Sequence, residues 1–187
     1  MAAQQKKWKD ARKDLEEAVR LFPRYAEAWY ELSRALEQTK DYGRAREAYR
    51  QAVATDEKYV LPAVQLAGIA VREEKWDEVL DATARVVELE PSGYPGAYYM
   101  KAAAHFNRKE YADAEASARE AVKLDTDHRF PDANHIYGVL MMMRRDYQGA
   151  AEQLRLYLKL APRAADAEMA RGGLASCEKA LKALEKQ

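Results

Sequence analysis

The sequence predicts an all-α fold in which antiparallel helix pairs stack into an α-solenoid of about ten helices. One observation is composition: 36 alanines stand against 16 β-branched residues, with only 8 glycines and 6 prolines, which favours helix over sheet. A second is an aromatic residue that recurs every 34 to 36 residues. A third is the run of apolar residues at helical spacing that follows each recurrence. One helix pair cannot bury its apolar face alone, so we expect the pairs to stack.

The recurring segment places an aromatic residue three positions before a small or apolar one. It occurs five times, at Trp8/Ala11, Tyr42/Ala45, Trp76/Val79, Tyr111/Ala114 and Tyr147/Ala150. Each occurrence begins a helical stripe, and a proline follows three of the five stripes, at Pro23, Pro91 and Pro162. Proline lacks the amide hydrogen that a helix needs, so these positions predict helix ends.

The residues between these segments complete a longer pattern. The best copy runs from Ala26 to Tyr59 and carries Trp29, Leu32, Ala45 and Tyr49, with a serine where a glycine is usual. This pattern resembles the tetratricopeptide repeat, W-x2-L-G-x2-Y followed by A-x3-F and P over 34 residues. The resemblance covers nearly the whole chain and implies a right-handed superhelix.

We expect a single tetratricopeptide array over residues 1–187. Its parts are a half repeat at 5–25 with only the second helix, repeats at 26–59, 60–94, 95–130 and 131–162, and a capping helix at 163–187. Because the array begins half-way through a unit, we hypothesise that Met1 is an engineered start and that the chain is a fragment of a longer protein.

Charge and apolar content narrow the function classes. The 31 basic and 31 acidic side chains cancel, which argues against coating nucleic acid or an anionic membrane. No apolar run approaches the roughly 18 residues of a membrane span, and the N-terminus lacks the apolar stretch of a signal peptide, so we expect a soluble chain of unknown localisation. The lone Cys177 cannot form an internal disulfide.

The motifs of catalysis are missing from the sequence. No histidine and cysteine spacing suits a metal, and no glycine-rich phosphate loop is present. Cys177 falls on the apolar stripe of the last helix, where a packing role is far more common than a nucleophilic one. The sequence therefore predicts neither an enzyme, nor a cofactor, nor a metal site.

The resemblance implies that ligand contacts come from the first helix of each repeat. The candidate groove residues are Tyr30, Arg34, Leu61, Val64, Arg72, Tyr99, Phe106, His135, Val139, Met142 and Met143. Many are apolar, and a large exposed apolar strip on a soluble protein usually serves binding. Tight winding of the superhelix would instead make the same residues ordinary core, and the helical period does not decide between these alternatives.

These residues predict a non-enzymatic scaffold that binds a peptide or helix of another protein. Repeats that grip the acidic tails of heat-shock chaperones use lysine and asparagine at two positions of the repeat, and the resemblance therefore disfavours that ligand class. At the first position this chain has Tyr30, Val64, Tyr99 and His135, and at the second Arg34, Gly68, Ala103 and Val139. Two other functions stay open: an assembly module that self-associates through an open N-terminal edge, and the regulatory arm of a longer multidomain protein.

Overall fold

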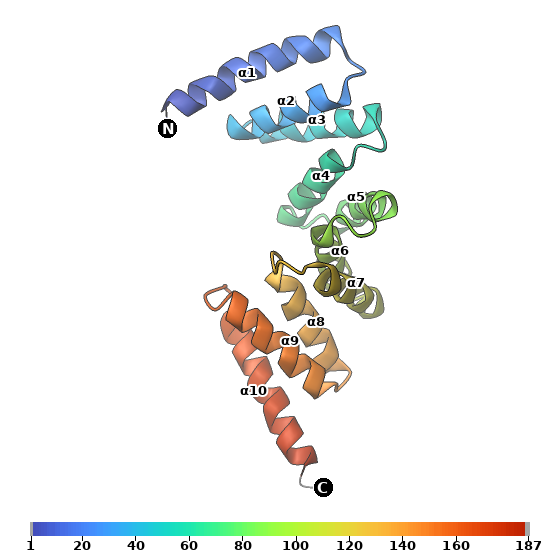
Figure 1. Ribbon diagram of the computed structural model, residues 1–187, viewed down its shortest axis with the longest axis vertical. Coiled ribbons are helices and arrows are strands. Elements are labelled where there is room, and N and C mark those ends of the chain that lie inside the picture. Colours follow the sequence, from blue (N-terminus) through green and yellow to red (C-terminus); the bar gives the residue numbers. More distant parts are fainter. Residues whose placement is uncertain (1, 186–187) are drawn as a thin grey trace. The chain divides into compact units, whose positions relative to one another are not determined.

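The computed structural model describes the backbone of residues 2–185 and the side chains of residues 6–185, and every regular element in that part is an α-helix (Figure 1). The chain divides into two compact units, residues 1–91 and 92–187. The first unit contains α1 (Ala2–Leu21), α2 (Ala26–Gln38), α3 (Tyr42–Thr55), α4 (Val60–Arg72) and α5 (Trp76–Leu89). The second contains α6 (Pro95–Asn107), α7 (Tyr111–Leu124), α8 (Pro131–Met143), α9 (Tyr147–Leu160) and α10 (Ala167–Leu184).

In the first unit, α2 pairs with α3 and α4 pairs with α5, while α1 packs on α2 and α3 packs on α4. Alanines such as Ala45 are fully buried where two helices meet, since only a small side chain lets the backbones approach closely. Leu32 and Leu36 fill the space around them. A second buried cluster, containing Tyr30 and Tyr49, joins this pair to α4.

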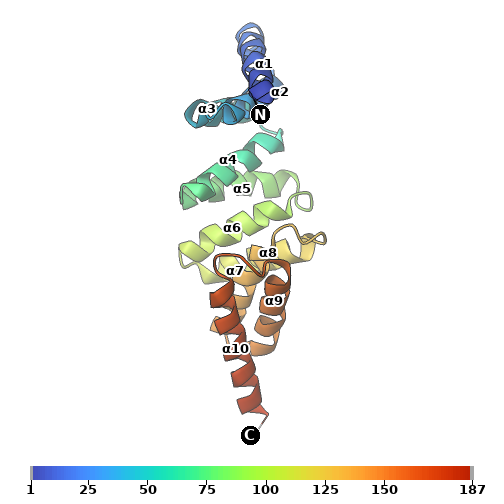
Figure 2. The same ribbon diagram turned by 90° about the vertical axis from the view of Figure 1, so that its left-hand side faces the viewer.

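In the second unit, α6 pairs with α7 and α8 pairs with α9, and α10 packs on both α9 and α8 (Figure 2). Gly138 of α8 lies against Leu154 of α9 so closely that a Cβ atom there would stand 3.0 Å from the Leu154 Cγ atom. The fully buried Tyr157 and Cys177 complete the same core. The packing of Cys177 agrees with its position on an apolar stripe.

The same turn joins the two helices of every pair. After α2, Lys40 adopts a left-handed backbone with φ 63°, the Asp41 amide donates to the Leu36 carbonyl at 2.9 Å, and the Lys40 amide donates to the Glu37 carbonyl at 2.9 Å. This is the Schellman motif, which satisfies the last carbonyls of a helix. Left-handed residues recur at the equivalent places, Glu74, Lys109 and Arg145, with φ 55°, 64° and 66°.

The last helix begins at Ala167, whereas the sequence led us to expect a capping helix from residue 163. Residues 162–166 form turns instead. Asp166, the residue before the helix, is held by Tyr157 of α9 and His135 of α8, which fixes these turns against the neighbouring pair. From Ala167 the helix runs unbroken through Gly172 and Gly173.

Candidate functional site

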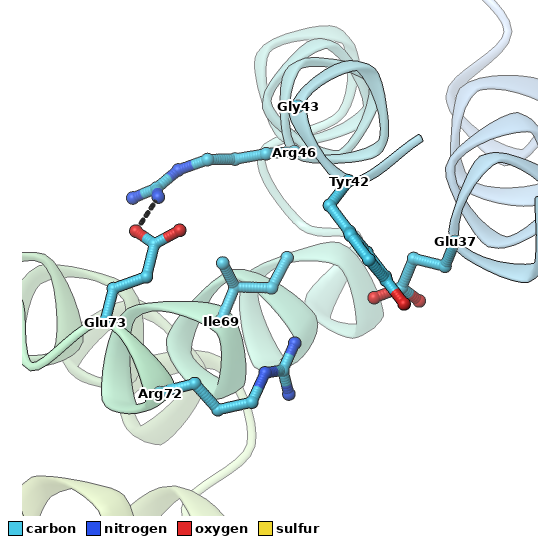
Figure 3. A pocket seen from close by; sticks show the side chains of 7 residues that line it. All are labelled: Glu37, Tyr42, Gly43, Arg46, Ile69, Arg72 and Glu73. Atoms are coloured by element: carbon cyan, nitrogen blue, oxygen red, sulfur yellow. Dashed lines mark hydrogen bonds and ion pairs between the residues drawn. The ribbon is translucent and has the colours of Figure 1, made fainter. Parts of the chain in front are cut away.

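A pocket of about 460 Å³ lies between α2, α3 and α4 in the first unit. Its lining residues, drawn in Figure 3, are Glu37, Tyr42, Gly43, Arg46, Ile69, Arg72 and Glu73. Ile69 supplies an apolar floor, and the Tyr42 ring, 61% exposed, reaches from α3 toward α4. The pocket therefore combines an aromatic wall with charged groups of both signs.

Two of these charges neutralise each other. Arg46, whose side chain is only 11% exposed, forms ion pairs with Glu73 and Glu78. Lys75 Nζ also lies 2.9 Å from Glu73 Oε2. The hydrogen bonds from Lys75 and then Arg46 lower the pKa of the Glu73 carboxyl. Arg46 and Glu73 are thus a structural link from α3 to the end of α4.

The other two charged residues of the pocket, Arg72 and Glu37, keep hydrogen-bonding capacity for a ligand. The exposed Arg72 guanidinium has no ion pair or hydrogen bond with any described residue, and it extends from α4 into the same space as the Tyr42 ring (Figure 3). Glu37 accepts one hydrogen bond, 2.8 Å long, from the Tyr49 hydroxyl. A carboxylate has about four acceptor positions, so Glu37 can accept more. A donor and an acceptor therefore line one pocket.

The second unit holds a polar cluster centred on His135. This side chain is buried, its Nδ1 atom lies 2.6 Å from Asp166 Oδ2, and its ring stacks on Tyr157 at 4.7 Å between centroids. The Tyr157 hydroxyl donates to the other oxygen of Asp166. The His135 Nε2 atom is buried and has no hydrogen-bond partner.

Asp132 and Tyr99 extend this cluster. Asp132 lies one helical turn before His135, is half-buried, and has no hydrogen bond or ion pair with the described residues. Burial raises the pKa of its carboxyl, and the charge of Asp166 adds to the rise, whereas His135 opposes it. Burial also raises the pKa of Tyr99 to about 12, with the charges of Asp132 and Asp166 acting in the same direction. Asp132 and Tyr99 thus interact electrostatically with Asp166.

The remaining groove candidates of the first unit pack on the protein. Tyr30 is buried against Tyr49 and Tyr59, with ring centroids 5.9 Å and 5.3 Å away. Arg34 is exposed, pairs with Glu31 at 3.0 Å and lies 5.9 Å over the Tyr30 ring. The other two, Leu61 and Val64, are half-buried. Of the first-unit candidates, only Arg72 therefore enters the pocket.

The groove candidates of the second unit differ in how exposed their side chains are. Phe106 is half-buried and meets the Tyr111 ring edge-on at 5.9 Å. Met142 and Val139 are half-buried, whereas Met143 is 54% exposed. Most of these residues are half-buried, so they contact the core and still keep some exposed surface. The strip is therefore neither a fully exposed groove nor fully buried core, which are the two alternatives that the sequence left open.

Sequence reasoning missed Tyr42, Tyr157 and Asp166. The sequence pattern uses Tyr42 only as a marker of the recurring segment, whereas in the structure it starts α3 and is exposed. Asp166 meets His135 across 31 positions of sequence, and no local pattern marks such a contact. The signal that could have found Tyr42 is its place at the first position of α3, where a side chain faces away from the following turns.

Chemistry of other kinds has little support in the part of the chain that the structure describes. No group of three histidine, cysteine, aspartate or glutamate side chains there could hold a metal ion. Burial raises the pKa of the Cys177 thiol, which disfavours the reactive thiolate. No described helix is long and apolar enough to cross a bilayer.

Helix pairs repeated at a period near 34 residues, each closed by the same turn, define a helical repeat protein of the α-solenoid class. The comparisons give the family. Two models described as tetratricopeptide repeat match residues 2–59 and 95–128, and the chain is a tetratricopeptide repeat protein. The predicted family is thereby confirmed.

Solved structures agree on the fold. YrrB, described as a TPR protein with an unusual peptide-binding site, matches with a TM-score of 0.73 and 19% identity over 91% of this chain and 86% of YrrB. MamA from Desulfovibrio magneticus RS-1 matches at 0.68 and 19% identity, over 83% and 86%. PilF of Pseudomonas aeruginosa matches at 0.66 and 19% identity, over 97% and 86%. No curated protein matches. The predicted solenoid fold is confirmed.

Proposed function

We propose that this chain is a non-enzymatic scaffold that binds a peptide or helix of another protein on the face formed by the first helices of its repeats. Membership of a family built for protein interaction supports this function, as does the likeness to a TPR protein described as having a peptide-binding site. The observation that carries it is the pocket around Arg72, Tyr42 and Glu37 in the first unit.

The pocket suits a peptide because its open groups match an amide. The Arg72 guanidinium donates to a carbonyl oxygen, and the Glu37 carboxylate accepts from an N–H group. Ile69 and the Tyr42 ring then cover an apolar side chain of the same peptide, since apolar contact supplies most of the binding free energy in such grooves. Specificity on this account comes from one donor and one acceptor on an otherwise apolar wall.

The test is peptide display on the immobilised chain, followed by affinity measurements on the selected peptides. We expect Tyr42→Ala and Arg72→Gln each to weaken binding at least tenfold. The first removes the aromatic wall, and the second removes the guanidinium that donates to the peptide carbonyl. Tyr25→Ala and Arg24→Gln are the matched controls, since both residues are exposed in the same unit and lie outside the pocket. We expect them to leave affinity within twofold.

Two results would overturn this function. One is that neither Tyr42→Ala nor Arg72→Gln changes the affinity of the selected peptides. The other is a display selection that enriches no peptide at all. Thermal unfolding of each variant, monitored by circular dichroism, distinguishes lost binding from lost fold.

Self-association is the second candidate, and one observation favours it. Leu21, Phe22 and Tyr25 are 54%, 64% and 53% exposed around the turn from α1 to α2. By contrast, the exposed side chains of α1 are largely charged, which suits a surface facing water better than one stacked on a second copy. Light scattering at rising concentration tests the idea: a dimer abolished by Phe22→Ser supports it, and a strict monomer contradicts it.

A further inference from the structure

We propose a second site in the second unit, where Asp132, Asp166, His135 and Tyr99 bind an arginine side chain of the partner. This inference rests on the proposed function, because it assigns chemistry to one residue of the bound peptide. The site is distinct from the Arg72 pocket, since each belongs to a different unit.

The first observation is the unsatisfied nitrogen of His135. The residue is 9% exposed, and its Nδ1 atom is committed to the Asp166 carboxylate, so Nδ1 carries the hydrogen and Nε2 offers a lone pair. Nε2 has no donor within the described residues. Buried polar atoms in native proteins nearly always have a partner. The lone pair therefore calls for an N–H or O–H group from outside the chain.

The second observation is the carboxylate of Asp132. It is half-buried without an ion pair or hydrogen bond from the described residues, although most buried carboxylates are paired. Aspartate and histidine three positions apart lie on one face of a helix, and long helical side chains lean back toward the preceding turn. The His135 ring therefore leans toward Asp132, and one ligand can reach both.

The third observation is the charge and shape of the surroundings. Asp132 and Asp166 both favour a cation, and the half-buried Tyr99 supplies an aromatic ring of the kind that binds cations. Tyr99 is held in place by stacking on Phe130 at 6.1 Å between centroids. A guanidinium fits this set because it is planar, positively charged and carries five N–H donors, enough for two carboxylates and the His135 nitrogen.

A metal ion fits less well. No three acidic, histidine or cysteine side chains converge closely enough to hold one anywhere in residues 6–185. An anionic ligand would meet the repulsion of two aspartate carboxylates at this site. The donors that remain are those of a basic side chain, and arginine matches the acceptor geometry better than the single ammonium of lysine.

The experiment is an NMR titration of the labelled full chain with N-acetyl-L-arginine amide, and N-acetyl-L-citrulline amide is the uncharged match. We expect saturable shifts of the His135 Nε2 resonance and of the Tyr99 ring with a Kd on the order of millimolar, since one side chain supplies little affinity. We expect the citrulline amide to bind at least fivefold more weakly. Asp132→Asn should weaken arginine amide binding at least fivefold, while Asp127→Asn, an exposed loop aspartate of the same unit, should not.

Several outcomes overturn the site: no saturable shift at His135, equal binding of the citrulline amide, or no effect of Asp132→Asn in a variant that keeps its dispersed spectrum. Displayed peptides distinguish this failure from failure of the proposed function. Peptides that bind through Tyr42 and Arg72 but tolerate arginine-to-citrulline replacement contradict the arginine site alone. A chain that enriches no peptide contradicts the proposed function, whatever the amide titration gives.

Discussion

The Nδ1 atom of His135 lies 2.6 Å from the Oδ2 atom of Asp166, and this contact ties α8 to the turns that precede α10. The Tyr157 hydroxyl bonds to the second oxygen of the same carboxylate. Burial raises the pKa of Asp166, but the hydrogen bonds from Tyr157 and His135 outweigh it, so the carboxyl titrates below its usual range. Asp166 therefore stabilises the fold in its ionised form.

We expect Asp166→Asn to lower the free energy of unfolding by roughly 1 to 2 kcal/mol at pH 7, because the amide accepts more weakly than a carboxylate. The value stays modest because the side chain is 37% exposed and solvent screens its charge. A depressed folded pKa means that this stability is present above the unfolded pKa, near pH 4, and is lost as pH falls through the folded pKa. Urea unfolding of both chains between pH 7 and pH 2.5 checks this, and a gap that stays constant down to pH 2.5 would contradict it.

Asp132→Asn should act with the opposite sign. The pKa of Asp132 is raised in the folded chain, chiefly by burial, so the stability linked to its protonated form is lost as pH rises through the folded pKa. A neutral amide avoids that loss. We expect the variant to match or exceed the parent in unfolding free energy at pH 7, with the advantage vanishing by about pH 4. A variant clearly less stable than the parent at pH 7 would indicate that Asp132 has a stabilising partner after all.

The helices could be predicted from sequence because their signals are local and repeated. The aromatic of the recurring segment is the first residue of α3, α5, α7 and α9: Tyr42, Trp76, Tyr111 and Tyr147. Burial of small residues such as Ala45 and Ala114 follows from the same spacing. A fivefold repetition removes the ambiguity that any one apolar stripe carries.

The candidate sites could be predicted only in part, because the burial of a side chain and its contacts with residues distant in sequence leave no local sequence pattern. The repeat pattern identified the helix face of Arg72 and His135, yet one is exposed in a pocket and the other is buried. Burial of His135 depends on Tyr157 and on Asp166, a residue outside the last helix. Nothing in the spacing of residues 131–143 indicates either contact.

The left-handed turns predict that glycine is the better residue at four places. A Cβ atom at positive φ costs roughly 1 kcal/mol in steric strain, which glycine avoids. The four residues with this backbone are Lys40, Glu74, Lys109 and Arg145. The greater freedom of glycine in the unfolded chain offsets part of this gain. We expect each change to glycine to raise the unfolding free energy by about 0.5 kcal/mol, and changes in separate turns to add.

Thermal and urea unfolding measure this effect, and Lys40→Ala is the control because alanine keeps the Cβ atom. No gain from Lys40→Gly over Lys40→Ala would show that the turn is not left-handed in solution. The absence of glycine at all four turns also explains why sequence patterns did not mark them as helix stops.

Gly172 and Gly173 of α10 form a matched pair for testing how this helix packs. A Cβ atom on Gly172 would meet nothing within 4 Å, whereas one on Gly173 would stand 3.3 Å from both Leu154 Cδ1 and Met142 Sδ. Glycine inside a helix costs roughly 1 kcal/mol relative to alanine. We therefore expect Gly172→Ala to stabilise the chain by about that amount, and Gly173→Ala to gain clearly less, because Leu154 is fully buried and resists displacement. Equal gains in unfolding free energy would mean that α10 does not lie against α8 and α9 as described, and a loss at Gly172 would mean that the helix breaks there.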